Sequence, residues 1–316
     1  MFCINLETHD PFFNLALEEV LLKSREEEYL ILGINDPSVI IGKHQVAHME
    51  VNTKFVAENS IPVIRRISGG GTVFHDQGNL NFTFIRRCET GKQVDFRKYT
   101  RPVIDFLVSL GIQARFEGKS DIKIAGFKIS GNAEHVHRNR VLHHGTLLFS
   151  SSLEMLKNSI RTDKSHYSAR AVGSNPAPVI NLSEKLNIFS DVNQFSKEMM
   201  RHFLKNMTDI EVCNISPQDE EEAISLAATK YRRWEWNFAY GPEYTFKNTF
   251  QSAGKIYSCN LFVSNGIIKE CTIEGSDKMR SFAEKLIRCR HMVPDFSEVF
   301  NKENINISGE EIFNFF

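Results

Sequence analysis

The residues best suited to chemistry form one run, Arg65-Arg66-Ile67-Ser68-Gly69-Gly70-Gly71-Thr72-Val73-Phe74-His75-Asp76. Three consecutive glycines are costly in backbone entropy, so they are expected where the chain approaches another group closely or turns with a positive φ. Arginine offers a planar fork of donors for carboxylate or phosphate, and exposed main-chain N–H groups bind anions. The run predicts an anion cradle, placed by its β-branched neighbours in a tight turn between two strands. A plain hairpin is the alternative.

A second candidate is Lys128, in the segment Gly126-Phe127-Lys128-Ile129-Ser130-Gly131. On an expected strand edge, its ammonium could offset phosphate charge and bind a carboxylate. Such a pair contributes ~1 kcal/mol at ~4 Å in water and several times more in a closed pocket. A solvated strand lysine is the alternative. Asp121 could orient Lys128 or assist a magnesium ion, or it could be a solvated turn residue.

Histidines supply the third candidate, His143-His144-Gly145-Thr146. Adjacent strand residues point to opposite faces, so one histidine is expected to face a pocket, and we expect His144 to act there through hydrogen bonds. His135 and His137 share a face, but no carboxylate or cysteine completes an evident tetrahedral set. No metal site made of protein ligands alone is therefore expected.

The segment Glu117-Gly118-Lys119-Ser120 is not a P-loop, because Gln113 stands where that motif needs glycine.

The composition describes an ordinary globular protein. The 316 residues include 38 Lys and Arg against 39 Asp and Glu, a formal charge of −1, which disfavours nucleic acid as a partner. No apolar run is long enough to cross a membrane, and the N-terminus has no basic-then-apolar signal. The six cysteines form no CxxC pair and read as reduced thiols. We expect a cytoplasmic protein that binds neither nucleic acid nor membrane.

The expected elements are strands followed by helices, without a regular βαβ rhythm, which predicts an α+β fold. Asp10-Pro11 and Asp95 are helix starts, each with an apolar face behind it. Further helices are expected at 151–160, 194–206, 216–231 and 278–289, with a short final one. Strands are expected at 29–34, 38–41, 62–67, 72–75, 80–85, 112–116, 122–124, 128–129 and 141–149. A β-meander is expected over 245–275, with a turn at Asn265-Gly266. We therefore expect a first domain at 1–240 and a smaller α+β domain at 245–316.

Taken together, these motifs resemble the lipoate–protein ligase family, in its bacterial form. The resemblance covers roughly three quarters of the chain and depends on the order of its motifs. They are Asn14-Leu15-Ala16-Leu17-Glu18-Glu19, Ile41-Gly42-Lys43-His44-Gln45, Arg65–Asp76 with Gly78-Asn79-Leu80-Asn81, Lys128 with Gly131, His144–Leu148, and Trp234 with Trp236.

The resemblance implies a catalytic domain with mixed sheets and packed helices, shared with biotin ligases, and a small C-terminal domain. It implies that ATP activates lipoate, with Mg²⁺, to lipoyl-AMP and diphosphate, and that a target lysine then takes the lipoyl group. Lys128 resembles the residue that contacts lipoate carboxylate and α-phosphate. The implied ATP and lipoyl-AMP contacts are Arg66, Ser68, Gly70, Gly71, Thr72, Val73, Phe74, His75, Asp121, Lys128 and His144. An apolar slot near Val73 and Phe82 would take the acyl tail.

One segment departs from the family pattern. Where active ligases usually carry S-V-x-S-R-V-x-N-L, this chain reads Ser174-Asn175-Pro176-Ala177-Pro178-Val179-Ile180-Asn181-Leu182, so the arginine is missing. Two alternatives to a full ligase therefore stay open: a lipoyltransferase that uses only preformed lipoyl-AMP, and a non-catalytic protein that binds lipoate or an adenylate. The implied partners are apo lipoyl domains of 2-oxoacid dehydrogenase acyltransferase subunits and the glycine cleavage H protein.

Overall fold

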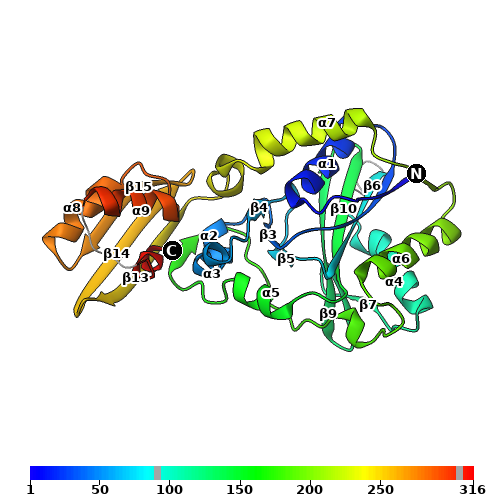
Figure 1. Cartoon of the computed structure of the whole chain (residues 1–316), viewed down its shortest axis with the longest axis horizontal. Coiled ribbons are helices and arrows are strands. Elements are labelled where there is room, and N and C mark those ends of the chain that lie inside the picture. Colours follow the sequence, from blue (N-terminus) through cyan, green and yellow to red (C-terminus); the bar gives the residue numbers. More distant parts are fainter. Residues whose placement is uncertain (89–93, 304–308) are drawn as a thin grey trace.

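The computed structural model describes residues 1–88, 94–303 and 309–316. It has a large sheet with helices on both faces and a smaller sheet with helices that extends to one side (Figure 1). This arrangement confirms the α+β class. The large sheet has the strand order β12 (Glu211–Val212), β1 (Phe2–Asn5), β2 (Tyr29–Ile34), β6 (Asn79–Arg87), β10 (Arg140–Leu148), β9 (Phe127–His137), β8 (Asp121–Ile124), β7 (Arg115–Glu117). Its pairs are antiparallel except for β1 with β12 and β1 with β2.

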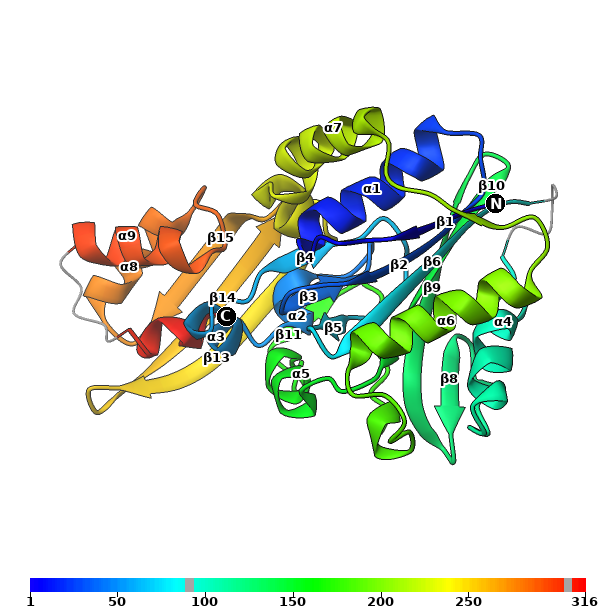
Figure 2. The same cartoon turned by 45° about the vertical axis from the view of Figure 1, so that its right-hand side comes forward.

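Helices cover the two faces of the large sheet. On one face lie α1 (Pro11–Ser24) and α7 (Pro217–Leu226), and on the other α4 (Phe96–Ser109) and α6 (Val192–Asn206) (Figures 1 and 2). The predicted starts are confirmed: the Asp10 side chain accepts from the amide of Phe12, and that of Asp95 accepts from the amide of Lys98. The helix expected over 216–231 ends at Leu226 and continues as a π-helical segment, Ala227–Tyr231.

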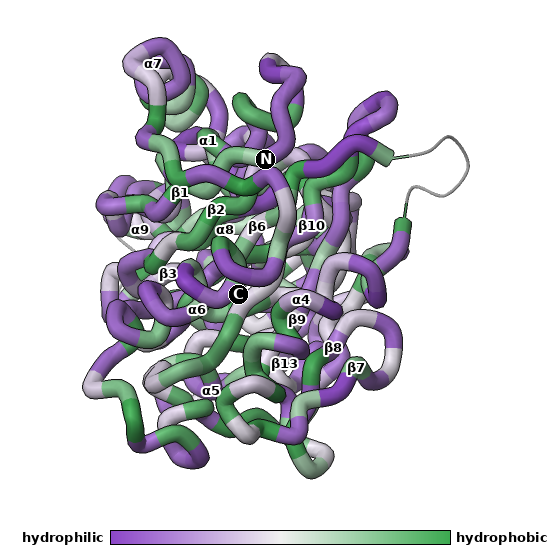
Figure 3. Tube along the Cα trace, turned by 90° about the vertical axis from the view of Figure 1, so that its right-hand side faces the viewer, coloured by the Kyte–Doolittle hydropathy of each residue, from purple (hydrophilic) through white to green (hydrophobic). Residues whose placement is uncertain are grey.

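Each face has its own hydrophobic cluster. Leu30, Phe82 and Phe84 pack against α4 and α6, whereas Ile31, Ile85 and Leu142 pack against α1 and α7. This alternation along the strands is what a sheet buried on both faces requires. In Figure 3 green, hydrophobic stretches of the chain accordingly run through the middle of the molecule around β2 and β6.

A small sheet beside the large one carries the glycine run. Its order is β4 (Val63–Arg65), β3 (Ser38–Ile41), β5 (Val73–His75), so β3 lies between the two strands that the run connects. The run connects two strands as predicted, but the prediction of a tight turn is wrong, because β3 lies between them. The run instead crosses from one edge of the sheet to the other, past the end of β3. Three helices adjoin this region, α2 (Ala47–Glu50), α3 (Thr53–Glu58) and α5 (Leu153–Ser159).

The second body is built on a four-stranded sheet of order β11 (Tyr167–Ala169), β13 (Tyr244–Ser252), β14 (Lys255–Ser264), β15 (Ile267–Glu274), with α8 (Asp277–Leu286), α9 (Val293–Lys302) and a last turn, Glu311–Phe315. The predicted meander is confirmed. Its turn residues Asn265 and Gly266 both have positive φ, 52° and 68°, as a tight hairpin turn requires. The sheet begins at Tyr244 but also takes β11 from within the first 240 residues.

Arg65 fastens the connector between the two bodies to the first body. Its side chain is fully buried, and its guanidinium donates to the carbonyls of Gly42, Lys43, Gln45, Trp236 and Asn237. Trp236 and Asn237 belong to the π-helical connector, Glu235–Ala239, that leads into β13. The Arg65 guanidinium, expected to bind an anion, therefore binds main-chain oxygens instead.

In the described residues, no helix has the length and apolar character to cross a membrane.

Candidate active site

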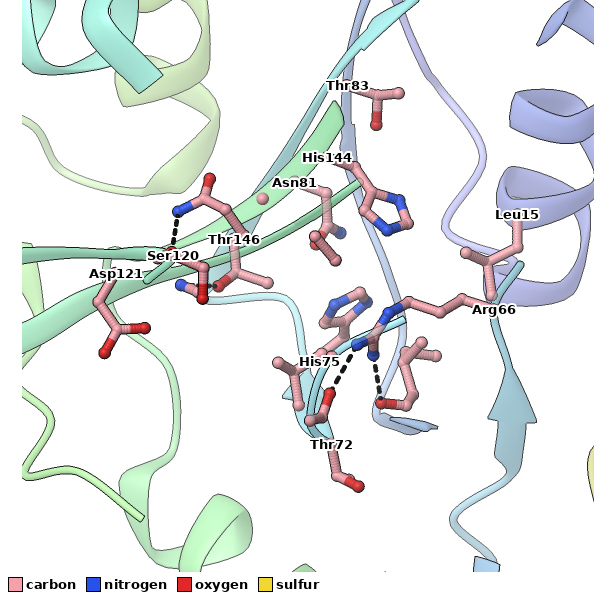
Figure 4. A pocket seen from close by; sticks show the side chains of 18 of the residues that line it. Leu15, Arg66, Thr72, His75, Asn81, Thr83, Ser120, Asp121, His144 and Thr146 are labelled. Atoms are coloured by element: carbon pink, nitrogen blue, oxygen red, sulfur yellow. Dashed lines mark hydrogen bonds between the residues drawn. The ribbon is translucent and has the colours of Figure 1, made fainter. Parts of the chain in front are cut away.

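A cavity of about 540 Å³ lies between α1, the small sheet and strands β2, β6, β9 and β10. This volume falls in the range of small-molecule sites. Figure 4 shows Arg66, His75 and His144 directed into the same space, with Asp121 and Ser120 toward one end of it. The sequence-predicted residues that line it are Arg66, Gly70, Gly71, Thr72, Val73, His75, Asp121, Lys128 and His144. Ser68 and Phe74 are not among the lining residues.

Lys128 and Asp121 form an ion pair at one end of the cavity. The Lys128 Nζ lies 2.9 Å from Oδ1 of Asp121, and both side chains are about one-fifth exposed (23% and 22%). The lysine side chain passes over Gly131, where an added Cβ would lie 3.1 Å from Nζ. Glycine thus leaves room for the lysine to lie along the cavity wall. An ammonium beside a carboxylate, close to glycine main chain, is suited to a ligand that carries phosphate or carboxylate.

The glycine run forms the neighbouring wall, and Arg66 holds its shape. The Arg66 guanidinium donates to the carbonyls of Gly69 (2.5 Å), Gly71 (2.7 Å) and Ile40 (3.1 Å), and its Nε donates to Ser68 Oγ at 2.9 Å. Gly70 adopts φ +83°, a conformation that favours glycine. Burial lowers the pKa of Arg66 to about 10, so the group keeps its charge at neutral pH. Arg66 therefore supports the cradle as well as lining it.

His144 joins two elements across the cavity. Its Nδ1 lies 2.9 Å from Oε2 of Glu18 on α1, and its Nε2 lies 2.6 Å from Oγ of Ser68. A carboxylate oxygen only accepts, so Nδ1–H of His144 donates to Glu18, and Nε2 is hydrogen-bonded to the Ser68 hydroxyl, which also accepts from Arg66. The prediction that His144 faces the pocket and His143 does not agrees with this geometry, since His143 is buried against Glu134 and Asn132.

His75 is a neutral, buried member of the lining. Burial, with His144 and Arg66 nearby, lowers its pKa to about 3. Its Nδ1 accepts from Nδ2 of Asn35 at 2.9 Å, and Oδ1 of Asn35 accepts from Asn14 at 2.7 Å. The proton of the neutral ring is therefore on Nε2.

Part of the cavity wall is apolar. Its lining includes Leu6, Leu15, Ile31, Ile40 and Val73. Gly33 lies among them, and an added Cβ there would approach Leu6 Cδ1 to 2.9 Å. Val73 lines the cavity, as do Asn81 and Thr83 on either side of Phe82, but the Phe82 ring itself is fully buried in the core on the far face of the sheet. Phe74 likewise packs with Val39, Ile41 and Val63 beneath the small sheet.

The altered segment 174–182 lies against the cavity. Val172–Asn175 contribute to the lining, while Pro178 and Ile180 pair with the main chain of Lys128. The amide of Lys128 donates to Pro178 O at 2.8 Å, and the amide of Ile180 donates to Lys128 O at 3.2 Å. The missing arginine is not replaced by Arg170, whose exposed side chain is absent from the cavity lining in the described structure.

Sequence reasoning missed Glu18 and Ser174, which line the cavity, and Gln45 and Glu50, which support its wall from behind. Glu18 belonged to a quoted motif, and its carboxylate between Leu15 and Leu22 on α1 was a detectable signal. Gln45 ended another motif and is completely buried. Glu50 and Ser174 gave no signal, because their partners are distant in sequence.

Within the described ranges, no group of three or more His, Cys, Asp or Glu could hold a metal ion.

Comparisons with known proteins show which family this chain is similar to. Residues 10–204 match the family described as the lipoyl protein ligase A/B catalytic domain. The chain is 35% identical over 279 residues to the lipoate-protein ligase LplJ of Bacillus subtilis, which covers 87% of this chain and 84% of that protein.

Two solved structures share the fold of the catalytic part. A bipartite lipoate protein ligase of Thermoplasma acidophilum, studied with its E2 lipoyl domain, superposes with a TM-score of 0.65 at 27% identity, over 75% of this chain and 95% of that chain. A lipoate-protein ligase A bound with ATP superposes with the same TM-score and identity, over 75% of this chain and 97% of that chain.

Proposed function

Because the chain belongs to the lipoyl protein ligase A/B family, we propose that it is an ATP-dependent lipoate–protein ligase. In the first half-reaction, a lipoate carboxylate oxygen attacks the α-phosphorus of ATP, and diphosphate leaves. In the second, the ε-amine of an acceptor lysine attacks the carbonyl of lipoyl-AMP, the acyl–phosphate bond breaks and AMP leaves. The amine proton is released to solvent.

The observation that carries the proposal is the continuity of the cavity. One space joins the apolar wall of Leu6, Leu15 and Ile31 to the polar end with Lys128 and the glycine run. An acyl tail and the phosphate of an adenylate need these two environments side by side. The reaction requires positioning and charge neutralisation and no enzyme nucleophile. Consistent with this, the next cysteine after Lys128 in the sequence is Cys213, which is not in the cavity lining of the described structure.

We assign the charge-neutralising role to Lys128. Asp121 holds its ammonium at the polar end, and in an enclosed site a positive charge beside the transferring phosphorus stabilises the developing negative charge far more than it would in water. The glycine main chain of residues 70 and 71 lines the same end. Mg²⁺ would be held mainly by the phosphates, with Asp121 as the carboxylate available there. When bound, the ion would add positive charge to the polyphosphate.

We further propose the acceptors and compartment. The lipoyl domain of a 2-oxoacid dehydrogenase acyltransferase and the glycine cleavage H protein carry the type of lysine that this reaction requires. The proposal of a cytoplasmic location is supported by the six free cysteines, among them the buried Cys3, Cys259 and Cys271.

The experiment measures two activities side by side. The first is diphosphate release from ATP with lipoate and magnesium, and the second is transfer from synthetic lipoyl-AMP to an apo lipoyl domain. We expect both in the natural protein. Lys128→Ala should abolish lipoate-dependent diphosphate release, whereas Lys123→Ala, on the adjacent strand and outside the cavity lining, should not. Transfer without diphosphate release would instead establish a lipoyltransferase, and absence of both activities would contradict an enzymatic role.

A further inference from the structure

Glu50 is a buried carboxylate just behind the cavity, at the end of α2. Its side chain is 1% exposed, and Nζ of Lys164 lies 2.5 Å from Oε1. The other oxygen, Oε2, accepts from Oγ of Ser174 at 2.5 Å and lies 3.4 Å from Oγ1 of Thr72. An ionised group at this depth is costly unless it is paired, so its position depends on these partners.

Ser174 is fully hydrogen-bonded. It donates to Glu50 and accepts from the amide of Thr72 at 2.8 Å and from Nε2 of Gln45 at 3.1 Å. A hydroxyl has one proton and two acceptor sites, and all three are used. The segment that contains Ser174 is thereby fastened to the glycine run.

Gln45 extends the same network. Its Oε1 accepts from the amide of Gly42 at 2.8 Å and from Thr72 Oγ1 at 3.0 Å. The close fit also explains a glycine, because a Cβ at Gly71 would lie 3.1 Å from Cα and Oγ of Ser174. Three chain segments that are distant in sequence therefore meet at one serine hydroxyl.

The segment has a second attachment at its other end. Pro178 and Ile180 bond to the main chain of Lys128, whereas Val172–Asn175, around the first attachment at Ser174, form part of the cavity wall. Residues 172–182 contain no lysine or arginine, so this wall contributes enclosure and dipoles and supplies no cationic side chain. Enclosure strengthens the interaction of Lys128 with an anionic ligand, because it excludes water from the site.

We propose that Glu50 is a positioning residue for ATP: through Ser174 it holds the Val172–Asn175 wall against the glycine run and so completes the nucleotide end of the cavity. This inference rests on the proposed ligase function. Lys164 neutralises the carboxylate, so that Glu50 can hold the wall without repelling a phosphate.

Ser174→Ala tests the proposal at the hydroxyl where the segments meet. The expected result is a rise of tenfold or more in KM for ATP in lipoate-dependent diphosphate release, with kcat changed less than threefold. Hydrogen exchange of the Thr72 amide should become faster in the free protein, because its acceptor is lost. Glu58→Gln, on the exposed face of the neighbouring α3, is the matched control and should change neither quantity.

The buried acid is tested by two further variants. Glu50→Ala should raise KM for ATP at least as much as Ser174→Ala. Glu50→Gln/Lys164→Met should return KM to within threefold of the natural value, because the glutamine carbonyl can accept from Ser174 and the unpaired ammonium has been removed. A purely structural role would lower the melting temperature of these variants without the selective change in KM.

The outcomes separate the inference from the function on which it rests. If the natural protein releases no diphosphate with lipoate, the proposed function fails. If the natural protein is active but Ser174→Ala keeps its KM for ATP within twofold and its Thr72 exchange rate, the positioning role of Glu50 is overturned.

Discussion

Asp121 and Lys128 form an ion pair within the β8–β9 hairpin, with Oδ1 and Nζ 2.9 Å apart. Their strands, β8 and β9, are joined at Ala125 and Gly126, which both have positive φ. A register shift between Ile122 and Lys123 lies beside the pair. The carboxylate therefore holds a lysine whose side chain is otherwise long and flexible, at the polar end of the cavity.

Replacement of Asp121 should weaken catalysis without removing the lysine. A hydrogen bond to a charged group contributes ~1.5–3 kcal/mol, which corresponds to a rate loss of about ten- to a hundredfold. We expect Asp121→Asn to lower kcat/KM for diphosphate release by that factor. Lys123→Ala serves as control, because Lys123 lies on the same strand as Asp121 but outside the cavity lining and is paired with Glu117. A change of less than twofold in Asp121→Asn would show that the carboxylate does not position Lys128.

The three glycines of the cradle should respond differently to alanine. At Gly69 an added Cβ meets nothing within 4 Å, so Gly69→Ala should fold and retain activity. At Gly70 the φ of +83° makes any side chain strained, at a cost of roughly 1–2 kcal/mol. At Gly71 the new methyl group would press on Ser174, so Gly71→Ala should raise KM for ATP. Thermal melts and steady-state kinetics distinguish the three cases, and equal behaviour of all three would contradict this description of the loop.

Arg65 should matter for stability and not through ligand contact. Its guanidinium binds five main-chain carbonyls in a fully buried position. Removal leaves buried acceptors without donors, at about 1–3 kcal/mol each where water cannot replace the arginine. We expect Arg65→Ala to lower the free energy of unfolding, measured by urea denaturation, by more than ~3 kcal/mol. Arg101→Ala, whose side chain is 75% exposed, should change stability by less than ~0.5 kcal/mol.

The contact between the two bodies should make stability depend on pH. Nε2 of His48 donates to His291 O at 2.7 Å, and Nδ1 of His291 accepts from Tyr244 OH at 2.6 Å. Burial lowers the pKa of His291 to about 4 and that of His48 well below its ordinary value. Both rings are therefore neutral in the folded protein and take up protons only on unfolding.

The sign of the effect follows from these pKa values. Stability is fully present above the unfolded pKa of about 6.5 and is lost as the pH falls toward the folded values. For His291 alone the loss reaches about 3 kcal/mol near pH 4, at ~1.4 kcal/mol per unit. Urea titrations between about pH 7 and pH 5 should show a falling free energy of unfolding. His291→Gln should flatten that slope, and an unchanged slope would refute the assignment.

Local patterns were sufficient for much of the fold. The cap at Asp10 with Pro11, the alternation along the buried strands and the Asn265-Gly266 turn all act over a few residues, so the sequence predicts them directly. The glycine run was identified for the same reason, since its entropy cost demands a special backbone wherever it is placed. The surroundings of that run were predicted less well, because β3 separates the two strands that it connects.

The sequence by itself determined the element types, the family resemblance and the chemistry available at Lys128 and the glycine run. Only the tertiary structure decided how these residues are employed. The neighbours Arg65 and Arg66 look equivalent in the chain, yet one binds the connector and the other shapes the cavity wall. Glu50 and Ser174 are separated by 124 positions and meet at 2.5 Å. Such partnerships depend on the packing of whole elements, which no local pattern encodes.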